Sequence, residues 1–147
     1  MKKNIRNFTK QELIHEFEKL SIPGFRAKQA YHWLFAHRIE RIGAMKNIPE
    51  NILQRIDSEF GIERTRIDVV QKSTDGTIKV GFKTYDNESI EGVIIPSEDR
   101  YTACVSSQVG CSLSCSFCAT GFLPRKRNLF HWEIFDQVFL LNELAEK

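Results

Sequence analysis

The chain has 147 residues, of which 41% are hydrophobic and 27% are charged, and its formal net charge is +2. This composition is typical of a soluble globular protein with one ordinary domain or two small ones. A net charge so close to zero excludes a strongly basic or acidic protein whose overall field selects its partner. The sequence contains no run of 18 apolar residues, so we expect no membrane span.

Charge is distributed unevenly along the chain. Residues 1–66 carry 13 Lys and Arg against 8 Asp and Glu, a local net charge of +5, whereas residues 67–100 carry 4 against 7. A basic first half is compatible with nucleic-acid binding but is not specific to it. The N-terminus is basic without the apolar core of a signal peptide. We therefore expect a cytoplasmic protein, in which clustered cysteines indicate metal binding or catalysis rather than a disulfide framework.

Residues 1–62 are predicted to form a small helical domain. Thr9 and Glu12 have the spacing of a capping box and precede an apolar stripe with helical periodicity. Gly61 is expected to be the C-cap of the last helix of this domain. Helices are predicted from Thr9 to about Leu20, from Arg26 to His37 and from about Glu50 to Phe60.

The pattern changes to that of β-structure after residue 62. Residues 63–100 are predicted to form an antiparallel meander that leads into the core of the next domain. Turn-forming residues at 73–76 and 86–87 separate its strands. The three predicted strands cover residues 67–70, 77–82 and 89–95.

Residues 101–147 are predicted to begin an α/β domain. A short strand over 101–105 is followed by a loop that contains three cysteines, from Ser106 to about Arg127, and then by an amphipathic helix over about 132–145. Strand, loop and helix form the first βα unit of an α/β domain. One such unit cannot build a sheet core, so we interpret the chain as a fragment and expect its last helix to expose an apolar stripe. The predicted fold class is an α+β N-terminal region followed by this single βα unit.

The cysteines Cys111, Cys115 and Cys118 have the spacing C-x3-C-x2-C. Three thiolates leave one coordination position unfilled, whereas a structural zinc site usually has four ligands. In a 4Fe–4S cluster held by three cysteines, one iron has no protein ligand and can bind a substrate or cofactor directly. The spacing therefore favours a reactive iron–sulfur centre over a purely structural metal.

Zinc is the main alternative, with Cys104, His131 or His37 as the fourth ligand, although zinc sites more often contain paired C-x2-C units. The corresponding function is a non-catalytic RNA-binding module stabilised by a metal. The basic run from Arg125 to Arg127 is equally compatible with contacts to RNA phosphates and with a solvated loop, because three charges make a small patch. An electron-transfer iron–sulfur protein is a third candidate, but it would normally enclose its cluster with four cysteines.

The segment from Cys104 to Gly121, CVSSQVGCSLSCSFCATG, closely resembles the signature of the RlmN family. Members of this family are radical S-adenosylmethionine (SAM) enzymes that methylate carbon 2 of adenosine in 23S ribosomal RNA and in tRNA. The related carbon 8 adenosine methyltransferases share the cysteine signature and are a close alternative. The similarity extends to residues 23–29 with Trp33-Leu34, 91–96, 99–100, 127–129 and 133–138.

The resemblance implies a domain organisation and a set of partners. Residues 1–62 would be the helical accessory domain with an RNA-binding role, residues 63–100 the meander, and residues 101–147 the start of a radical SAM partial α/β barrel. The implied partners are 23S rRNA, tRNA and an electron donor such as flavodoxin, for a monomeric protein that is not bound to a membrane.

The resemblance also implies roles for five site residues. Cys111, Cys115 and Cys118 match the ligands of a 4Fe–4S cluster whose open iron chelates SAM. Glu91 matches the proposed acceptor of the adenine C2 proton. Cys104 matches a cysteine that forms a disulfide with a methyl-carrying cysteine near the family's C-terminus and so releases the product; from residue type alone, it would more often be a buried structural thiol. The four cysteines of this sequence do not include the methyl carrier, so we expect the chain alone to be inactive.

Overall fold

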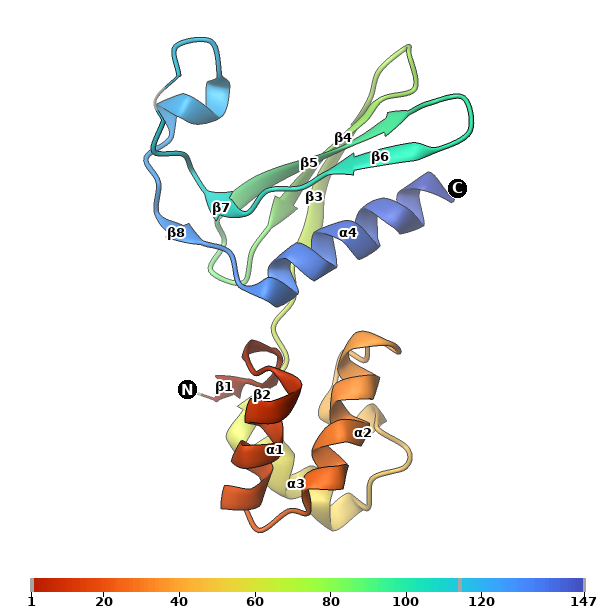
Figure 1. Ribbon diagram of the computed structural model, residues 1–147, viewed down its shortest axis with the longest axis vertical. Coiled ribbons are helices and arrows are strands. Elements are labelled where there is room, and N and C mark those ends of the chain that lie inside the picture. Colours follow the sequence, from red (N-terminus) through yellow and green to blue (C-terminus); the bar gives the residue numbers. More distant parts are fainter. Residues whose placement is uncertain (1, 114, 147) are drawn as a thin grey trace. The chain divides into compact units, whose positions relative to one another are not determined.

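The computed structural model describes residues 2–113 and 115–146. The chain divides into two compact units, Met1–Glu63 and Arg64–Lys147, and each is described by itself. Figure 1 labels the helices and strands of both units. None of the described helices combines the length and the apolar character needed to cross a membrane.

The first unit is built on three helices, as the sequence predicts. The N-terminal capping box is confirmed: the Thr9 hydroxyl accepts the Glu12 N–H, and the Glu12 carboxylate accepts the Thr9 N–H at 2.8 Å. The second helix begins two residues earlier than expected and also ends two residues earlier. The helices are α1 (Lys10–Lys19), α2 (Gly24–Phe35) and α3 (Glu50–Glu59), with short 3-10 turns at Ile5–Asn7 and Ile42–Ala44. The fully buried side chains of this unit include Leu13, Phe17, Leu34, Met45, Ile56 and Phe60.

The expectation that Gly61 caps α3 is wrong. The helix ends at Glu59, and the chain continues as the two-residue strand β2 (Phe60–Gly61), which pairs in parallel with β1 (Lys3–Asn4). The Asn4 side-chain oxygen accepts N–H groups from both Arg6 and Glu63, at 3.1 and 3.3 Å. These contacts hold the two ends of the unit together, so the residue after the helix is extended rather than left-handed.

The second unit contains a four-stranded antiparallel sheet in the order β3-β4-β5-β6. The predicted meander and the fourth strand are both confirmed. The turns follow the predicted polar segments, with Gly76 and Asn87 at positive φ values of 85° and 62°. The strands are β3 (Arg66–Lys72), β4 (Ile78–Lys83), β5 (Ser89–Pro96) and β6 (Tyr101–Cys104).

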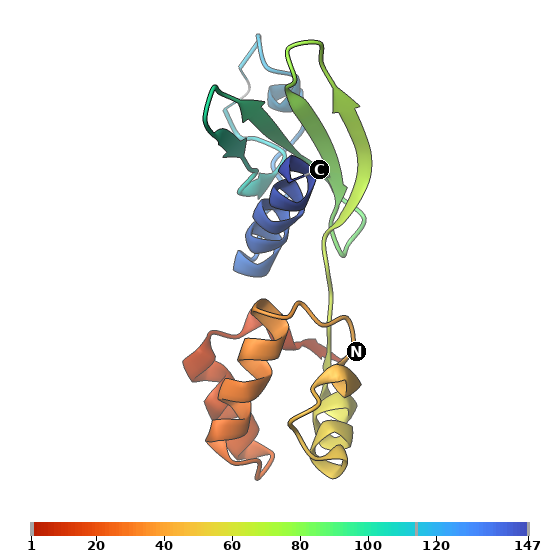
Figure 2. The ribbon, with the colours of Figure 1, turned by 90° about the vertical axis from the view of Figure 1, so that its right-hand side faces the viewer.

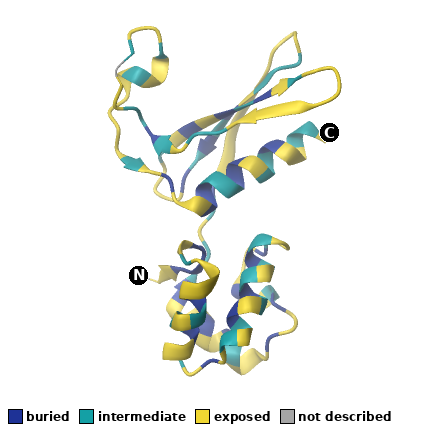
Figure 3. Cartoon of the chain, in the orientation of Figure 1, coloured by how far each residue is buried: buried dark blue, intermediate teal, exposed yellow. Residues whose placement is uncertain are grey.

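Helix α4 (His131–Ala145) packs against one face of this sheet, which both views of the ribbon show (Figures 1 and 2). Leu141 is buried together with Val80, Phe82 and Ile94 of the inner sheet face. Figure 3 shows buried segments both on this helix and on the sheet. A Cβ added at Gly92 would lie 3.2 Å from a Leu141 methyl group, so a side chain at this position would have to push the helix away. The expectation that α4 leaves its apolar stripe uncovered is therefore wrong for Leu141 and for the partly buried Ile134 and Leu144, which pack against the sheet, whereas Val138 remains exposed.

The loop with the three cysteines is closed by two short strands that the sequence does not predict. β7 (Gln108–Val109) pairs antiparallel with β8 (Arg127–Asn128). We call the intervening residues 110–126 the cysteine loop. Within it, Ala119–Phe122 forms a 3-10 turn. β7 contacts β5, and β8 leads directly into α4, so both ends of the loop are anchored in the second unit.

Candidate active site

The neck of the cysteine loop is fixed by backbone contacts. The Cys111 N–H donates to the Leu123 carbonyl at 3.1 Å, and Cys111 forms a parallel bridge with Pro124. Gly110 has φ +71°, and a Cβ at this position would lie 2.1 Å from the Pro124 carbonyl oxygen. Only glycine allows the two legs of the loop to approach so closely.

A second close approach folds the loop around its last two cysteines. The Cys118 N–H donates to the Cys115 carbonyl at 3.2 Å, and the Gly121 N–H donates to the Cys118 carbonyl at 2.9 Å. A Cβ at Gly121 would lie 2.7 Å from the Cys115 carbonyl oxygen. The sequence spacing C-x2-C thus corresponds to one tight turn closed by a glycine.

The three predicted cluster ligands lie on this one loop as free, partly buried thiols. The Leu113 N–H donates to Cys111 Sγ at 3.4 Å. Among the described residues, no three Cys, His, Asp or Glu side chains form a group that could hold a metal ion. As a donor set, three soft thiols fit an iron–sulfur cluster, and metal sites commonly take their final geometry only when the metal binds.

Large apolar side chains of the cysteine loop point outward. Phe117, the residue before the last cysteine, is 91% exposed. Leu113, Phe122 and Leu123 are also exposed. The loop is therefore positioned by its backbone and its two legs rather than by a hydrophobic core of its own.

A cavity of about 210 Å³ lies between the cysteine loop and strand β5. Glu91 lies in its wall, and the Glu91 carboxylate forms an ion pair with Lys79 Nζ at 2.7 Å while remaining half exposed. The structure thus brings this predicted proton acceptor beside the loop that carries the three thiols. The other lining residues are Ser89, Ile90, Ser106, Gln108, Gly110, Ala119, Thr120 and Leu123.

Cys104, at the end of β6, is an exposed thiol. The reading of this residue as a buried structural cysteine is therefore wrong. Its partner across the sheet is Val93, and side chains directly opposite each other share a face. Glu91 lies two residues before Val93 and points to the same face, because strand side chains alternate. The two residues predicted to act in catalysis are therefore diagonal neighbours on the sheet face opposite α4, a spacing of about 7–8 Å.

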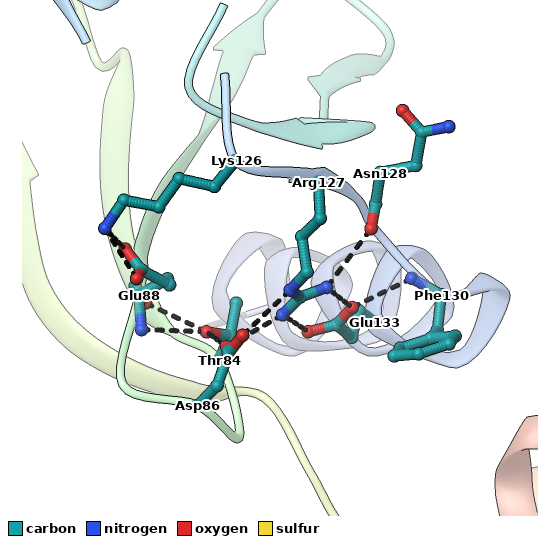
Figure 4. Close-up of polar contacts among 8 residues, drawn as sticks. All are labelled: Thr84, Asp86, Glu88, Lys126, Arg127, Asn128, Phe130 and Glu133. Atoms are coloured by element: carbon teal, nitrogen blue, oxygen red, sulfur yellow. Dashed lines mark hydrogen bonds and ion pairs between the residues drawn. The ribbon is translucent and has the colours of Figure 1, made fainter. Parts of the chain in front are cut away.

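An ion-pair network that sequence reasoning missed joins the end of the cysteine loop to the sheet and to α4 (Figure 4). Arg127 donates to both carboxylate oxygens of Asp86 at 2.8 Å, and to those of the fully buried Glu133 at 2.7 and 2.9 Å. Its guanidinium also lies over the rings of Tyr85 and Phe130. Two features of the sequence could have indicated this network: the turn at Asp86-Asn87 and Glu133 in the first turn of the last helix.

The electrostatics of this network follow from its geometry. Hydrogen bonds from Arg127 are the main reason that the pKa of Asp86 falls from 3.8 to about 2. The two carboxylates, Glu133 first, raise the pKa of the Arg127 guanidinium. Asp86 and Arg127 are therefore both charged at neutral pH, and the network provides charge-assisted, bidentate hydrogen bonds.

The basic run from Arg125 to Arg127 is solvated in part. Arg125 and Lys126 are exposed, as the reading of a solvated loop expects, whereas Arg127 binds the two carboxylates described above. Lys126 pairs with Glu88 at 2.6 Å, and Arg125 donates to the Asn128 side chain at 2.7 Å. Lys126 and Arg127 therefore connect the end of the loop to the turn before β5, and contact of this run with RNA stays a prediction.

The chain is similar to a family of RNA-modifying enzymes. Residues 3–62 match the family model described as the ribosomal RNA large subunit methyltransferase N-terminal domain. A probable dual-specificity RNA methyltransferase RlmN from Cytophaga hutchinsonii is 47% identical over 99% of this chain, and a probable RlmN from Chlorobaculum tepidum is 41% identical over 98%. This chain covers 40% and 41% of those two proteins, so it spans about two fifths of the length of the curated relatives that it matches.

A solved structure agrees with these matches. The crystal structure of a radical SAM methyltransferase from Sphaerobacter thermophilus has a TM-score of 0.78 and 32% sequence identity, over 98% of this chain and 42% of that one. The expected combination of a helical domain, an antiparallel sheet and the beginning of a radical SAM fold is confirmed. The chain is therefore similar to RlmN family proteins over about two fifths of their length, and its residues 3–62 match their N-terminal domain.

Proposed function

We propose that this chain is part of a radical SAM enzyme that methylates carbon 2 of adenosine in 23S rRNA and in tRNA. The observation that carries the proposal is the cavity between the cysteine loop and Glu91, with Cys104 on the same sheet face as that carboxylate. The relatives' names support RNA methylation as the reaction class.

Cys111, Cys115 and Cys118 would hold a 4Fe–4S cluster, with SAM on the iron that lacks a protein ligand. When bound, these two groups supply the one-electron chemistry that activates an otherwise inert C–H bond. The contribution of the chain is to present three thiols on a loop whose neck is fixed at Gly110 and Cys111. A one-electron donor is required, and a flavodoxin belongs to a suitable class. The free thiols suit a reducing compartment such as the cytoplasm.

Glu91 would accept the proton that adenine C2 loses when the methylated product forms. A general base must lie within hydrogen-bonding reach of the proton it takes. Glu91 is one of the residues that line the cavity, and its half-exposed carboxylate is paired with Lys79. The role needs only an accessible carboxylate at this position, which a half-exposed side chain provides.

Cys104 would complete turnover by disulfide formation with the methyl-carrying cysteine, a residue outside this sequence. The Cys104 thiolate attacks that sulfur to form the S–S bond while the bond between the sulfur and the product carbon breaks. The electron pair of the broken bond stays on the carbon, which takes up a proton and becomes the methyl group of the released base. A thiol that takes part in such an exchange must be accessible to its partner. Cys104 meets this requirement because it is exposed at the end of an edge strand.

The proposal is tested with the protein expressed from its own gene in a bacterial host whose corresponding methyltransferase has been deleted. Mass spectrometry should detect 2-methyladenosine in rRNA and tRNA, and anaerobic protein should contain iron and sulfide whose spectrum changes with SAM. The variants Cys118→Ala, Glu91→Gln and Cys104→Ala should each abolish the modified nucleoside, but only Cys118→Ala should also remove the iron. Stoichiometric zinc without iron would instead support an RNA-binding module, and 8-methyladenosine would assign the reaction to carbon 8.

A further inference from the structure

Helix α4 carries two buried polar side chains one turn apart, and each binds a different leg of the segment that contains the cysteine loop. Gln137 accepts the Ser106 N–H at 2.9 Å and donates to the Ser106 carbonyl at 3.0 Å, just before β7. Glu133 binds Arg127, in β8, through both carboxylate oxygens. Both α4 side chains are fully buried. The helix thus contacts the chain immediately before and immediately after the loop.

The same contacts reach the second wall of the cavity. Ser106 Oγ donates to the Glu91 carbonyl at 2.8 Å, and Arg127 extends the network to Asp86 in the turn that leads into β5. Strand β5 contributes Ser89, Ile90 and Glu91 to the cavity, and the loop contributes Ala119, Thr120 and Leu123. A change at Gln137 or Arg127 is therefore transmitted to both walls.

We propose that Glu133, Gln137 and Arg127 are positioning residues that set the distance between the cysteine loop and the Glu91 strand. None of the three lines the cavity, so they act through Ser106, Asp86 and the legs of the loop. The reason for this arrangement rests on the function proposed above, in which the iron–sulfur cluster and the Glu91 carboxylate must both act on the same substrate. The arrangement itself is a property of the chain without any cofactor.

The hydrogen-bonding groups of these residues explain why similar side chains would not replace them. The guanidinium of Arg127 binds two carboxylates with its planar fork, whereas lysine offers a single point charge without that geometry. Gln137 presents one donor and one acceptor to a single backbone residue, and glutamate would lack the donor. Each contact is buried or partly buried, where a misplaced polar group is costly.

The test measures the loop directly, in the chain without metal. Alkylation rates of Cys111, Cys115 and Cys118 are followed by mass spectrometry, together with hydrogen exchange of the loop amides. We expect Gln137→Leu and Arg127→Lys each to increase the alkylation rates and the hydrogen-exchange rates about tenfold or more, because each substitution removes hydrogen bonds of a buried or charged group. The matched control is Asp136→Ala, which removes another fully buried polar side chain of α4, one that accepts the Thr65 N–H at 3.1 Å just before β3.

If these residues had a purely structural role, all variants of buried polar residues with equal thermal stability would show the same labelling rates of the loop. The proposal is overturned if Asp136→Ala accelerates loop labelling as much as Gln137→Leu at equal thermal stability, or if the rates in Gln137→Leu stay within about twofold of the unsubstituted protein. Should Arg127→Lys fold poorly, the pair Arg127→Met with Glu133→Gln removes both charges together; it should regain stability while the loop stays labile.

A second measurement uses the protein from its own gene after reconstitution with iron and sulfide. Gln137→Leu should bind iron but alter the electron paramagnetic resonance signal that SAM induces, which loss of stability alone would not do. If no variant, and not even the unsubstituted protein, assembles an iron–sulfur cluster, the proposed function fails. The labelling experiment is independent of this outcome, because it uses the chain without metal.

Discussion

Replacing Gly110 with alanine is expected to destabilise the second unit by about 2–5 kcal/mol. The residue has φ +71°, and a left-handed conformation costs a residue with a Cβ about 1–2 kcal/mol. The new Cβ would also lie 2.1 Å from the Pro124 carbonyl oxygen. Because this neighbour is backbone, no rotamer change relieves the overlap, and forced overpacking adds about 1–3 kcal/mol.

The best control for this substitution is Gly76→Ala in the turn between β3 and β4. Gly76 also has a positive φ, +85°, but its added Cβ would meet only the Pro96 side chain, at 3.2 Å. This variant should therefore show the conformational cost alone, about 1–2 kcal/mol. The difference between the two variants isolates the contact between the two legs of the cysteine loop.

Urea unfolding followed by tryptophan fluorescence measures both variants. The chain has two tryptophans, so in a Trp33→Phe background the signal reports on Trp132, which is 1% exposed in the second unit. The reasoning is refuted if Gly110→Ala costs no more than Gly76→Ala. That result would mean that Pro124 moves away freely and that the neck of the loop is not fixed.

Three further predictions concern other parts of the chain. The pKa of Asp86 is lowered to about 2, so its ion pair stabilises the fold above pH 4 and is lost as the pH falls from about 4 to 2; the stability difference from Asp86→Asn should be about 1 kcal/mol at pH 6 and vanish near pH 2 in urea titrations. Thr9→Ala should cost the first unit about 1 kcal/mol by circular dichroism, while Thr9→Ser should not. Leu141→Ala should cost about 2–5 kcal/mol, whereas the half-exposed Val138→Ala should change stability little.

Elements defined by local patterns could be predicted from the sequence. The capping box at Thr9, the apolar stripes of the helices and the polar turns of the meander each depend on residues within one or two turns of each other. The β1–β2 pair could not be predicted in this way. It joins Asn4 to Gly61 across the whole first unit, and two-residue strands have no periodicity of their own.

The same distinction between local patterns and long-range contacts applies to the candidate site. The spacing of the three cysteines predicts thiol ligands, and family resemblance adds Glu91 and Cys104. The contacts of Arg127 remained hidden because its partner Asp86 is 41 residues away and because a run of basic residues has the same local pattern whether it is solvated or paired. The burial of Gln137 could not be predicted either, because a polar residue within an amphipathic helix is most simply placed on the solvent face of that helix.

The buried polar face of α4 has a consequence for how that helix sits on the sheet. Glu133, Asp136 and Gln137 are all fully buried, and apolar residues of similar size would often be at least as stabilising. Each binds a different segment of the second unit: β8, the start of β3 and the link before β7. A shift of α4 by one turn would remove all three sets of contacts at once, and each buried group left without a partner would cost about 1–3 kcal/mol. We infer that these residues select one register of the helix, and with it one position of the cysteine loop.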